Sequence, residues 1–185
     1  MARCFASGAV GTASRRGEGS AFVEQLPWLA DSSASRPVVE GGENRRTRTG
    51  PVAADPSASP AARDLAAAVN GLRRIIISNQ PVDLPWDNSE LVVARSDDDL
   101  IAAVTAIKRR PGRDLGVPGG VRTAQRFARL GLIDEYVLQV HPIAIGAGRP
   151  LFTQETGLQL IGAKAYDSGV MRLRYQTRSH SPAAT

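Results

Sequence analysis

Residues 114–141 read DLGVPGGVRTAQRFARLGLIDEYVLQVH, and this stretch decides the fold class. It begins with a short apolar run at 114–117, which predicts a buried strand. A helix is predicted over 121–130, with Gly131 placed to end it. A second strand is predicted over 135–141, where alternating residues indicate that one face is drier than the other. Strand, helix and strand in this order are typical of an α/β domain.

The upstream sequence repeats the same alternation of elements. Pro60 opens a predicted helix over 60–70, and the β-branched run RIIIS at 74–78 predicts a buried strand. Another strand is predicted over 90–94. Ser96 then caps a helix whose first turn holds Asp97, Asp98 and Asp99, which suits the helix dipole.

The downstream sequence predicts an antiparallel hairpin. Apolar segments at 158–165 and 170–176 flank the turn sequence YDSG at 166–169. The strands and helices together predict an α/β domain with a mixed sheet, and we expect helices on both faces.

The first third of the chain is of a different composition. Residues 1–59 are rich in Gly, Ser, Ala and Arg and show neither helical periodicity nor alternation. We therefore divide the chain into a low-order segment at 1–59, a folded domain at 60–178 and a polar tail at 179–185. The run GGENRRTRTG at 41–50 is a candidate phosphate loop, but a solvated linker explains it better because no predicted strand leads into it.

Composition excludes several classes of protein. The 185 residues carry 23 Lys plus Arg against 18 Asp plus Glu, so the net charge is +5, and no apolar run is long enough for a membrane span. A single cysteine, Cys4, and the absence of a signal-like N-terminus favour the cytoplasm. The arginines are spread along the chain and aromatic residues are only 5%, so we expect no nucleic-acid partner.

The ends of three predicted strands carry the most informative chemistry. Gly119 and Gly120 stand between a strand and a helix, where free backbone N–H groups and the cation of Arg122 suit a phosphate. A plain tight turn is the commoner explanation of a glycine pair. Ser78 and Arg95 follow two other strands, and ligands of open α/β sheets gather at such ends, so a nucleotide would fit. The alternative is that Ser78 only begins a turn and that the Ser96 next to Arg95 only caps its helix.

Five pieces of the sequence, in this order and spacing, resemble the dihydrofolate reductase superfamily. They are IIISNQ at 75–80, PWDNSELV at 85–92, GVPGG at 116–120, GLIDEYVLQVHPIAIGAGRPLF at 131–152 and GVMRLRY at 169–175. Within that superfamily they are most similar to the reductase domain at the C-terminus of the bifunctional riboflavin-biosynthesis deaminase-reductase. The run at 131–152 is the most specific of the five.

This resemblance implies a three-layer αβα domain that binds NADPH and transfers hydride to a pteridine- or pyrimidine-like heterocycle, as a 5-amino-6-(5-phosphoribosylamino)uracil reductase does. It also implies a homodimer and gives Asp134, Glu135 and the loop at 146–152 a role in the fold or a dimer edge. The cofactor-binding residues implied by matching position are Ser78, Asn79, Arg95, Val117, Pro118, Gly119, Gly120, Val121, Arg122 and Thr123.

Two departures limit the functional prediction. Nothing in the first 58 residues matches the family's opening S-L-D-G-type strand, so we expect the sheet to lack a normal first strand. The residues also indicate no catalytic acid, because His141 ends an apolar strand and is better explained as structural. The two histidines, at 141 and 180, are too far apart to indicate a metal site. The alternative to a reductase is therefore a catalytically incapable nucleotide-binding or dimerising remnant of the same fold.

Overall fold

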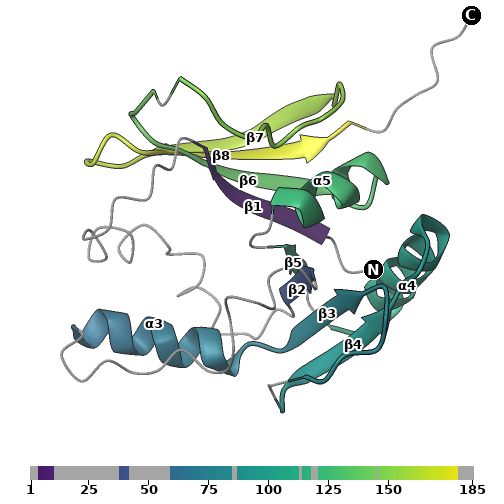
Figure 1. Ribbon diagram of the computed structural model, residues 1–185. Coiled ribbons are helices and arrows are strands. Elements are labelled where there is room, and N and C mark those ends of the chain that lie inside the picture. The colour runs from purple at the N-terminus through teal and green to yellow at the C-terminus, as the bar shows by residue number, and fades with distance from the viewer. Residues whose placement is uncertain are drawn as a thin grey trace, which may run out of the picture.

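Within the residues that the computed structural model describes, eight strands and three helices form one mixed α/β unit (Figure 1). The described residues are 4–10, 38–41, 59–84, 87–112, 114–117, 121–144 and 146–178. The elements, in chain order, are β1 (Cys4–Val10), β2 (Val38–Gly41), α3 (Pro60–Gly71), β3 (Arg74–Ser78), β4 (Ser89–Val93), α4 (Asp97–Arg109), β5 (Leu115–Val117), α5 (Val121–Arg129), β6 (Glu135–Val140), β7 (Leu158–Ala165) and β8 (Met171–Thr177).

The strands form a single sheet in the order β4-β3-β2-β5-β1-β6-β8-β7. The first six of these pair in parallel, and β8 runs antiparallel to both β6 and β7. The expected mixed sheet and C-terminal hairpin are therefore confirmed. Because the parallel strands end at the same edge, we call that edge the carboxyl edge and the opposite one the amino edge.

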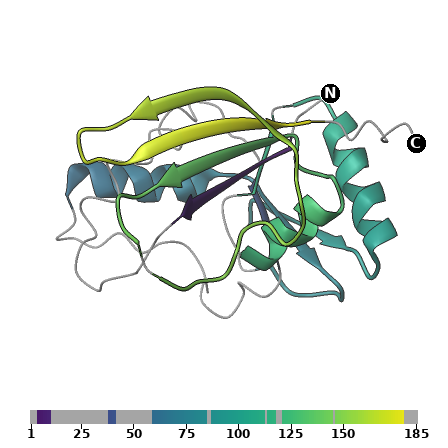
Figure 2. The ribbon, with the colours of Figure 1, turned by 90° about the horizontal axis from the view of Figure 1, so that it is seen from above.

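The helices cover both faces of the sheet, as expected. The connection from β2 through α3 to β3 runs toward one side of the sheet, whereas α4 and α5 lead back toward the other side. Right-handed crossovers in opposite directions place their helices on opposite faces. Figure 1 shows α4 and α5 on one side and α3 on the other, and the view from above in Figure 2 keeps α3 apart from both.

The core lies between the sheet and the α4–α5 layer. On α4, Leu100, Val104 and Ile107 are buried at helical spacing, and Phe127 is buried on α5. Each crossover thereby buries its apolar stripe on the strands beside it. The contributions of the strands to this core are Cys4, Val39, Ile75, Ile77, Leu115, Val117, Tyr136 and Leu138.

The expectation that the sheet lacks its opening strand is wrong. Strand β1 lies in the middle of the sheet, paired with β5 on one side and β6 on the other. Strand β2 joins β5 to β3 and leads directly into residues 42–50, so the argument that no strand precedes that loop is also wrong. The loop itself lies outside the described residues. The division of the chain at residue 59 stays a prediction.

Strand β6 corrects a second expectation. Its first five residues are all buried, so neither face is the drier one. The cause is its central position, since β1 and β8 flank it and α5 packs on one face. The ring of Tyr136 also makes an edge-to-face contact with Phe152, at 5.0 Å between centroids, which fixes the loop after β6 against the core.

The amino edge is held together by Asp134, just before β6. Its carboxylate accepts a hydrogen bond of 2.6 Å from the backbone N–H of Cys4 and forms an ion pair with the nearly buried Lys108 at the end of α4. Its carbonyl oxygen accepts from the N–H of Thr177 at 3.0 Å. Asp134 therefore joins β1, α4 and β8.

No helix among the described residues is long and apolar enough to cross a membrane.

Candidate functional site

The carboxyl ends of β3 and β4 lie side by side. Ser78, the last residue of β3, pairs with Val93, and its carbonyl oxygen accepts a hydrogen bond of 2.8 Å from the N–H of Ala94. Arg95 follows immediately, so the expected meeting of Ser78 and Arg95 at one edge is present in the structure. The hydroxyl of Ser78 accepts from the N–H of Gln80 at 3.3 Å and keeps its own proton to donate.

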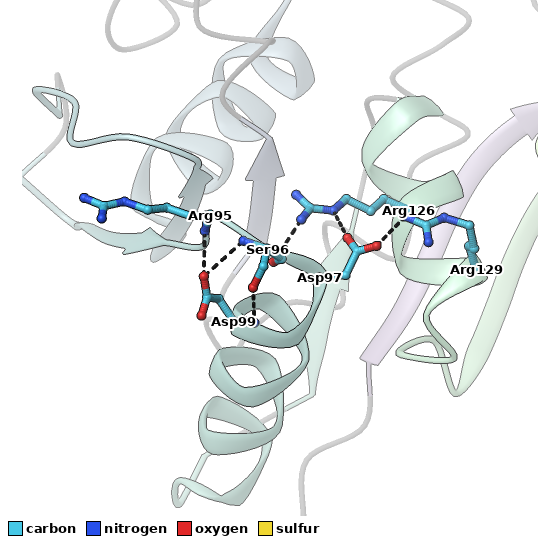
Figure 3. Close-up of polar contacts among 6 residues, drawn as sticks. All are labelled: Arg95, Ser96, Asp97, Asp99, Arg126 and Arg129. Atoms are coloured by element: carbon cyan, nitrogen blue, oxygen red, sulfur yellow. Dashed lines mark hydrogen bonds and ion pairs between the residues drawn. The ribbon is translucent and has the colours of Figure 1, made fainter.

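The N-terminus of α4 is closed by its own side chains (Figure 3). The carboxylate of Asp99 accepts hydrogen bonds from the N–H groups of Arg95 and Ser96, both at 3.0 Å. The hydroxyl of Ser96 accepts from the N–H of Asp99 at 3.0 Å, which completes a capping box. These bonds from the Ser96 and Arg95 amides hold the pKa of Asp99 below its usual value. The cap leaves little room for an external anion at this helix end.

The side chain of Arg95 is not part of this cap. It is exposed and, in Figure 3, extends away from Asp97. Among the described residues no carboxylate forms an ion pair with its guanidinium. The guanidinium is therefore available to a ligand phosphate.

A second polar group ties α4 to α5. Arg126 donates from Nε to Asp97 Oδ1 at 2.9 Å and from Nη2 to the carbonyl oxygen of Ser96 at 3.1 Å, and Arg129 donates to Asp97 Oδ2 at 2.8 Å. We call these four residues the Asp97 clamp (Figure 3). Hydrogen bonds from Arg129 and Arg126 lower the pKa of Asp97, which favours the charged carboxylate.

The two helices that begin at the carboxyl edge therefore differ in charge. The first turn of α4 contains three aspartates, whereas that of α5 contains none and carries the exposed Arg122. A helix N-terminus attracts anions through its free N–H groups and dipole, and acidic side chains in the first turn oppose this. Of these two helix ends, only that of α5 suits a phosphate.

The remaining residues of the implied cofactor site fall into three groups. Val117 is fully buried in the core, so only its backbone can face a ligand. Asn79 is exposed beside Ser78, and Val121 and Thr123 are half-buried in the first turn of α5. Pro118, Gly119 and Gly120 lie outside the described residues.

His141 follows β6 at the same edge, next to the end of β1. Its Nε2 atom is buried and has no hydrogen-bond partner among the residues that the structure describes. In the described part of the chain, no three side chains of His, Cys, Asp or Glu lie close enough to share a metal ion.

The Asp97 clamp was not predicted from the sequence. Asp97 was interpreted only as a residue that suits the helix dipole, and Arg126 and Arg129 only as two of the arginines spread along the chain. Their spacing along α5 places both on one helix face. That spacing does not reveal a partner on another helix.

The topology and the carboxyl edge define a class of protein: an αβα domain with the dihydrofolate reductase-like fold. The chain matches the family model of the RibD C-terminal domain over residues 34–172, and it belongs to that family.

The chain is also similar to known proteins in sequence and in fold. The chain is 33% identical over 92 residues to the uncharacterised protein YyaP of Bacillus subtilis (strain 168), a match that covers 48% of this chain and 47% of YyaP. The match thus spans about half the length of that relative. Acinetobacter baumannii RibD has a similar structure, with a TM-score of 0.64 and 15% identity over 96% of this chain and 58% of that one. A pyrimidine reductase-like protein from Corynebacterium diphtheriae gives a TM-score of 0.59 and 20% identity, and covers 96% and 92%.

Proposed function

We propose that this protein is an NADPH-dependent reductase that transfers hydride to a pteridine- or pyrimidine-like heterocycle, in the manner of a 5-amino-6-(5-phosphoribosylamino)uracil reductase. The observation that carries the proposal is that β3 and β4 end side by side at Ser78 and just before Arg95, and that Arg126 of α5 is bonded to Ser96, the residue after Arg95.

These groups fit a phosphorylated dinucleotide. The guanidinium of Arg95 has no described ion-pair partner and offers the planar pair of donors that a phosphate accepts. The hydroxyl of Ser78 donates beside it, and the acid-free first turn of α5 supplies backbone N–H groups for a pyrophosphate. In this assignment Arg95, Ser78 and Asn79 bind the 2'-phosphate region, and Val121, Arg122 and Thr123 follow the loop at 118–120 that binds the pyrophosphate.

The division of labour follows from this arrangement. A nicotinamide cofactor supplies the hydride, and the protein supplies binding, orientation and exclusion of water. The buried Val117 fixes where β5 ends and so where the loop at 118–120 begins. The choice of a pyrimidine-like substrate is supported by the family and by the name of the similar protein from Corynebacterium diphtheriae.

Titration of the purified protein with NADPH, followed by nicotinamide fluorescence, tests the proposal. Arg95→Ala should weaken binding about tenfold or more, because a charge-assisted hydrogen bond is lost. Arg109→Ala is the matched control: it removes the same charge from the exposed other end of α4, roughly 18 Å away along a 13-residue helix. Its affinity should stay within about twofold of the wild type.

The outcomes distinguish an NADPH-dependent reductase from a catalytically incapable remnant of the same fold. Binding that is lost in Arg95→Ala and kept in Arg109→Ala supports the reductase and justifies a substrate screen with pterins and aminouracils. A folded wild type that binds no NADPH contradicts it and favours the catalytically incapable remnant.

We also propose that the chain forms a homodimer through its C-terminal strands. The outermost strand β7 carries Leu160 and Ile161, which are 53% and 42% exposed, and its one charged residue is Lys164. Long apolar edge strands of this kind are prone to pair with another chain. A monomeric mass by light scattering at micromolar concentration would overturn this proposal.

A further inference from the structure

The Asp97 clamp bonds α5 to the residues just after Arg95. In the proposed function Arg95 binds the 2'-phosphate and the start of α5 binds the pyrophosphate. Ser96 and Asp97 directly follow Arg95, and Arg126 lies one turn after Arg122 on α5. We propose that Arg126 is a positioning residue that fixes the distance between the backbone at Arg95 and the start of α5. The inference rests on the proposed function, because it assigns both groups to one dinucleotide.

The contacts of Arg126 suit this role. Its guanidinium donates to two acceptors at once, the carboxylate of Asp97 and the backbone carbonyl of Ser96. The bond to a backbone oxygen holds the chain itself, at the residue that follows Arg95. A planar guanidinium with fixed donors holds such a pair of acceptors more rigidly than an ammonium group can.

Arg129 shares only half of these contacts. It donates to Asp97 but, among the described residues, makes no hydrogen bond to the Ser96 carbonyl or to the backbone of α4, and its side chain is 50% exposed. Arg129 therefore provides a matched control that has the same charge, the same helix and the same carboxylate partner as Arg126.

Fixed spacing matters only for a ligand that contacts both groups. When two contacts belong to one molecule, the second forms at an effective concentration that depends on how well the spacing is held. NADPH carries both a 2'-phosphate and a pyrophosphate. NADH lacks the 2'-phosphate, and 2'-AMP lacks the pyrophosphate, so neither gains from the spacing.

The experiment measures the dissociation constants of NADPH, NADH and 2'-AMP for the wild type and for Arg126→Gln, Arg129→Gln and Arg126→Lys. Arg126→Gln should weaken NADPH about tenfold and change NADH and 2'-AMP by less than about twofold. Arg129→Gln should leave all three within about twofold, because the bond to the Ser96 carbonyl remains. Arg126→Lys keeps the charge but only one of the two bonds, and should fall between the wild type and Arg126→Gln.

Three results would overturn the inference. An equal loss of all three ligands in Arg126→Gln would indicate general damage, and an equal effect of Arg129→Gln would trace the loss to the Asp97 ion pair alone. If both Arg126 variants keep the ratio of NADPH to NADH affinity of the wild type, Arg126 does not hold the spacing that NADPH uses. If instead the folded wild type binds no NADPH, the proposed function itself is wrong, and this result is distinct from the others.

Discussion

The two ends of the parallel strands are built in opposite ways. At the amino edge, Asp134 accepts from Cys4 and Lys108, and its backbone binds β1 and β8, so each polar group of this residue has a partner within the fold. At the carboxyl edge, the guanidinium of Arg95 is exposed and has no ion-pair partner in the described part of the chain. Asp134 therefore has its partners inside the fold, whereas the guanidinium of Arg95 faces solvent.

Because of this difference, substitutions of Asp134 and of Arg95 should affect different properties of the protein. Buried and paired groups are expensive to remove, because the partner is left without compensation. An exposed cation with no ion-pair partner among the described residues contributes little to stability. Removing Asp134 at the amino edge should therefore change unfolding, and removing the Arg95 side chain at the carboxyl edge should change affinity.

The largest effect is expected for Asp134→Ala. The side chain of Lys108 is only 11% exposed, so its ammonium group would lose its ion-pair partner in a poorly solvated place and keep only the 3.4 Å contact with the Leu132 carbonyl oxygen, and the Cys4 N–H would lose its carboxylate acceptor. Urea denaturation should show a loss of about 2 to 3 kcal/mol in the free energy of unfolding. NADPH affinity of the folded fraction should not change.

Asp167→Ala is the control, since Asp167 lies exposed in the β7–β8 turn. It should alter the free energy of unfolding by less than about 0.5 kcal/mol. Equal losses in the two variants would contradict the comparison between the edges.

Ser96→Ala probes a structural part of the carboxyl edge and should have an intermediate effect. The N–H of Asp99 loses its acceptor, which for a helix cap costs about 1 kcal/mol. Thermal unfolding should show the loss, and Ser96→Asp should restore most of it, because a carboxylate also caps. No loss in Ser96→Ala would mean that the cap is supplied from elsewhere.

Glu90, near the start of the outermost parallel strand, tests exposed ion pairs at the amino edge. Hydrogen bonds from Arg110, and to a smaller extent from Arg73, lower the pKa of Glu90 in the folded state below its ordinary value of 4.5. A lowered pKa means that the stabilisation is present above pH 4.5 and is lost as the pH falls through the folded value. The difference in unfolding free energy between wild type and Glu90→Gln should be below about 1 kcal/mol at pH 7 and should shrink toward pH 3. A difference that grows in acid would have the wrong sign.

The smallest effect on unfolding is expected for Arg95→Ala. Its side chain makes no described ion pair, so the free energy of unfolding should stay within about 0.5 kcal/mol of the wild type. Together with the expected loss of NADPH affinity, this gives the opposite pattern to Asp134→Ala. A clear destabilisation would show that Arg95 is part of the fold.

Much of the fold could be predicted because the signals are local. The capped helix after Ser96, the β-branched strand RIIIS and the hairpin around YDSG each depend on neighbouring residues, and their observed bounds lie within a residue or two of those predicted. The strand ends that carry Ser78 and Arg95 followed from the same reasoning.

The features that were missed depend on distant partners. Strand β1 has the sequence CFASGAV, which is short of branched apolar residues, and it is a strand because β5 and β6 bind it on both sides. The burial of both faces of β6 and the pairing of Asp97 with Arg126 likewise join residues far apart in the chain, by 29 positions in the second case. No local pattern reports such contacts.

The burial of Cys4 allows the opening of the sheet to be followed by thiol labelling. It is the only cysteine in the sequence, it is 0% exposed at the start of β1, and burial raises its pKa to about 12. A thiol reagent needs an accessible thiolate, so it can react only after β1 has separated from its neighbours. The rate of labelling under native conditions therefore reports the opening of β1 at Cys4, without any introduced cysteine.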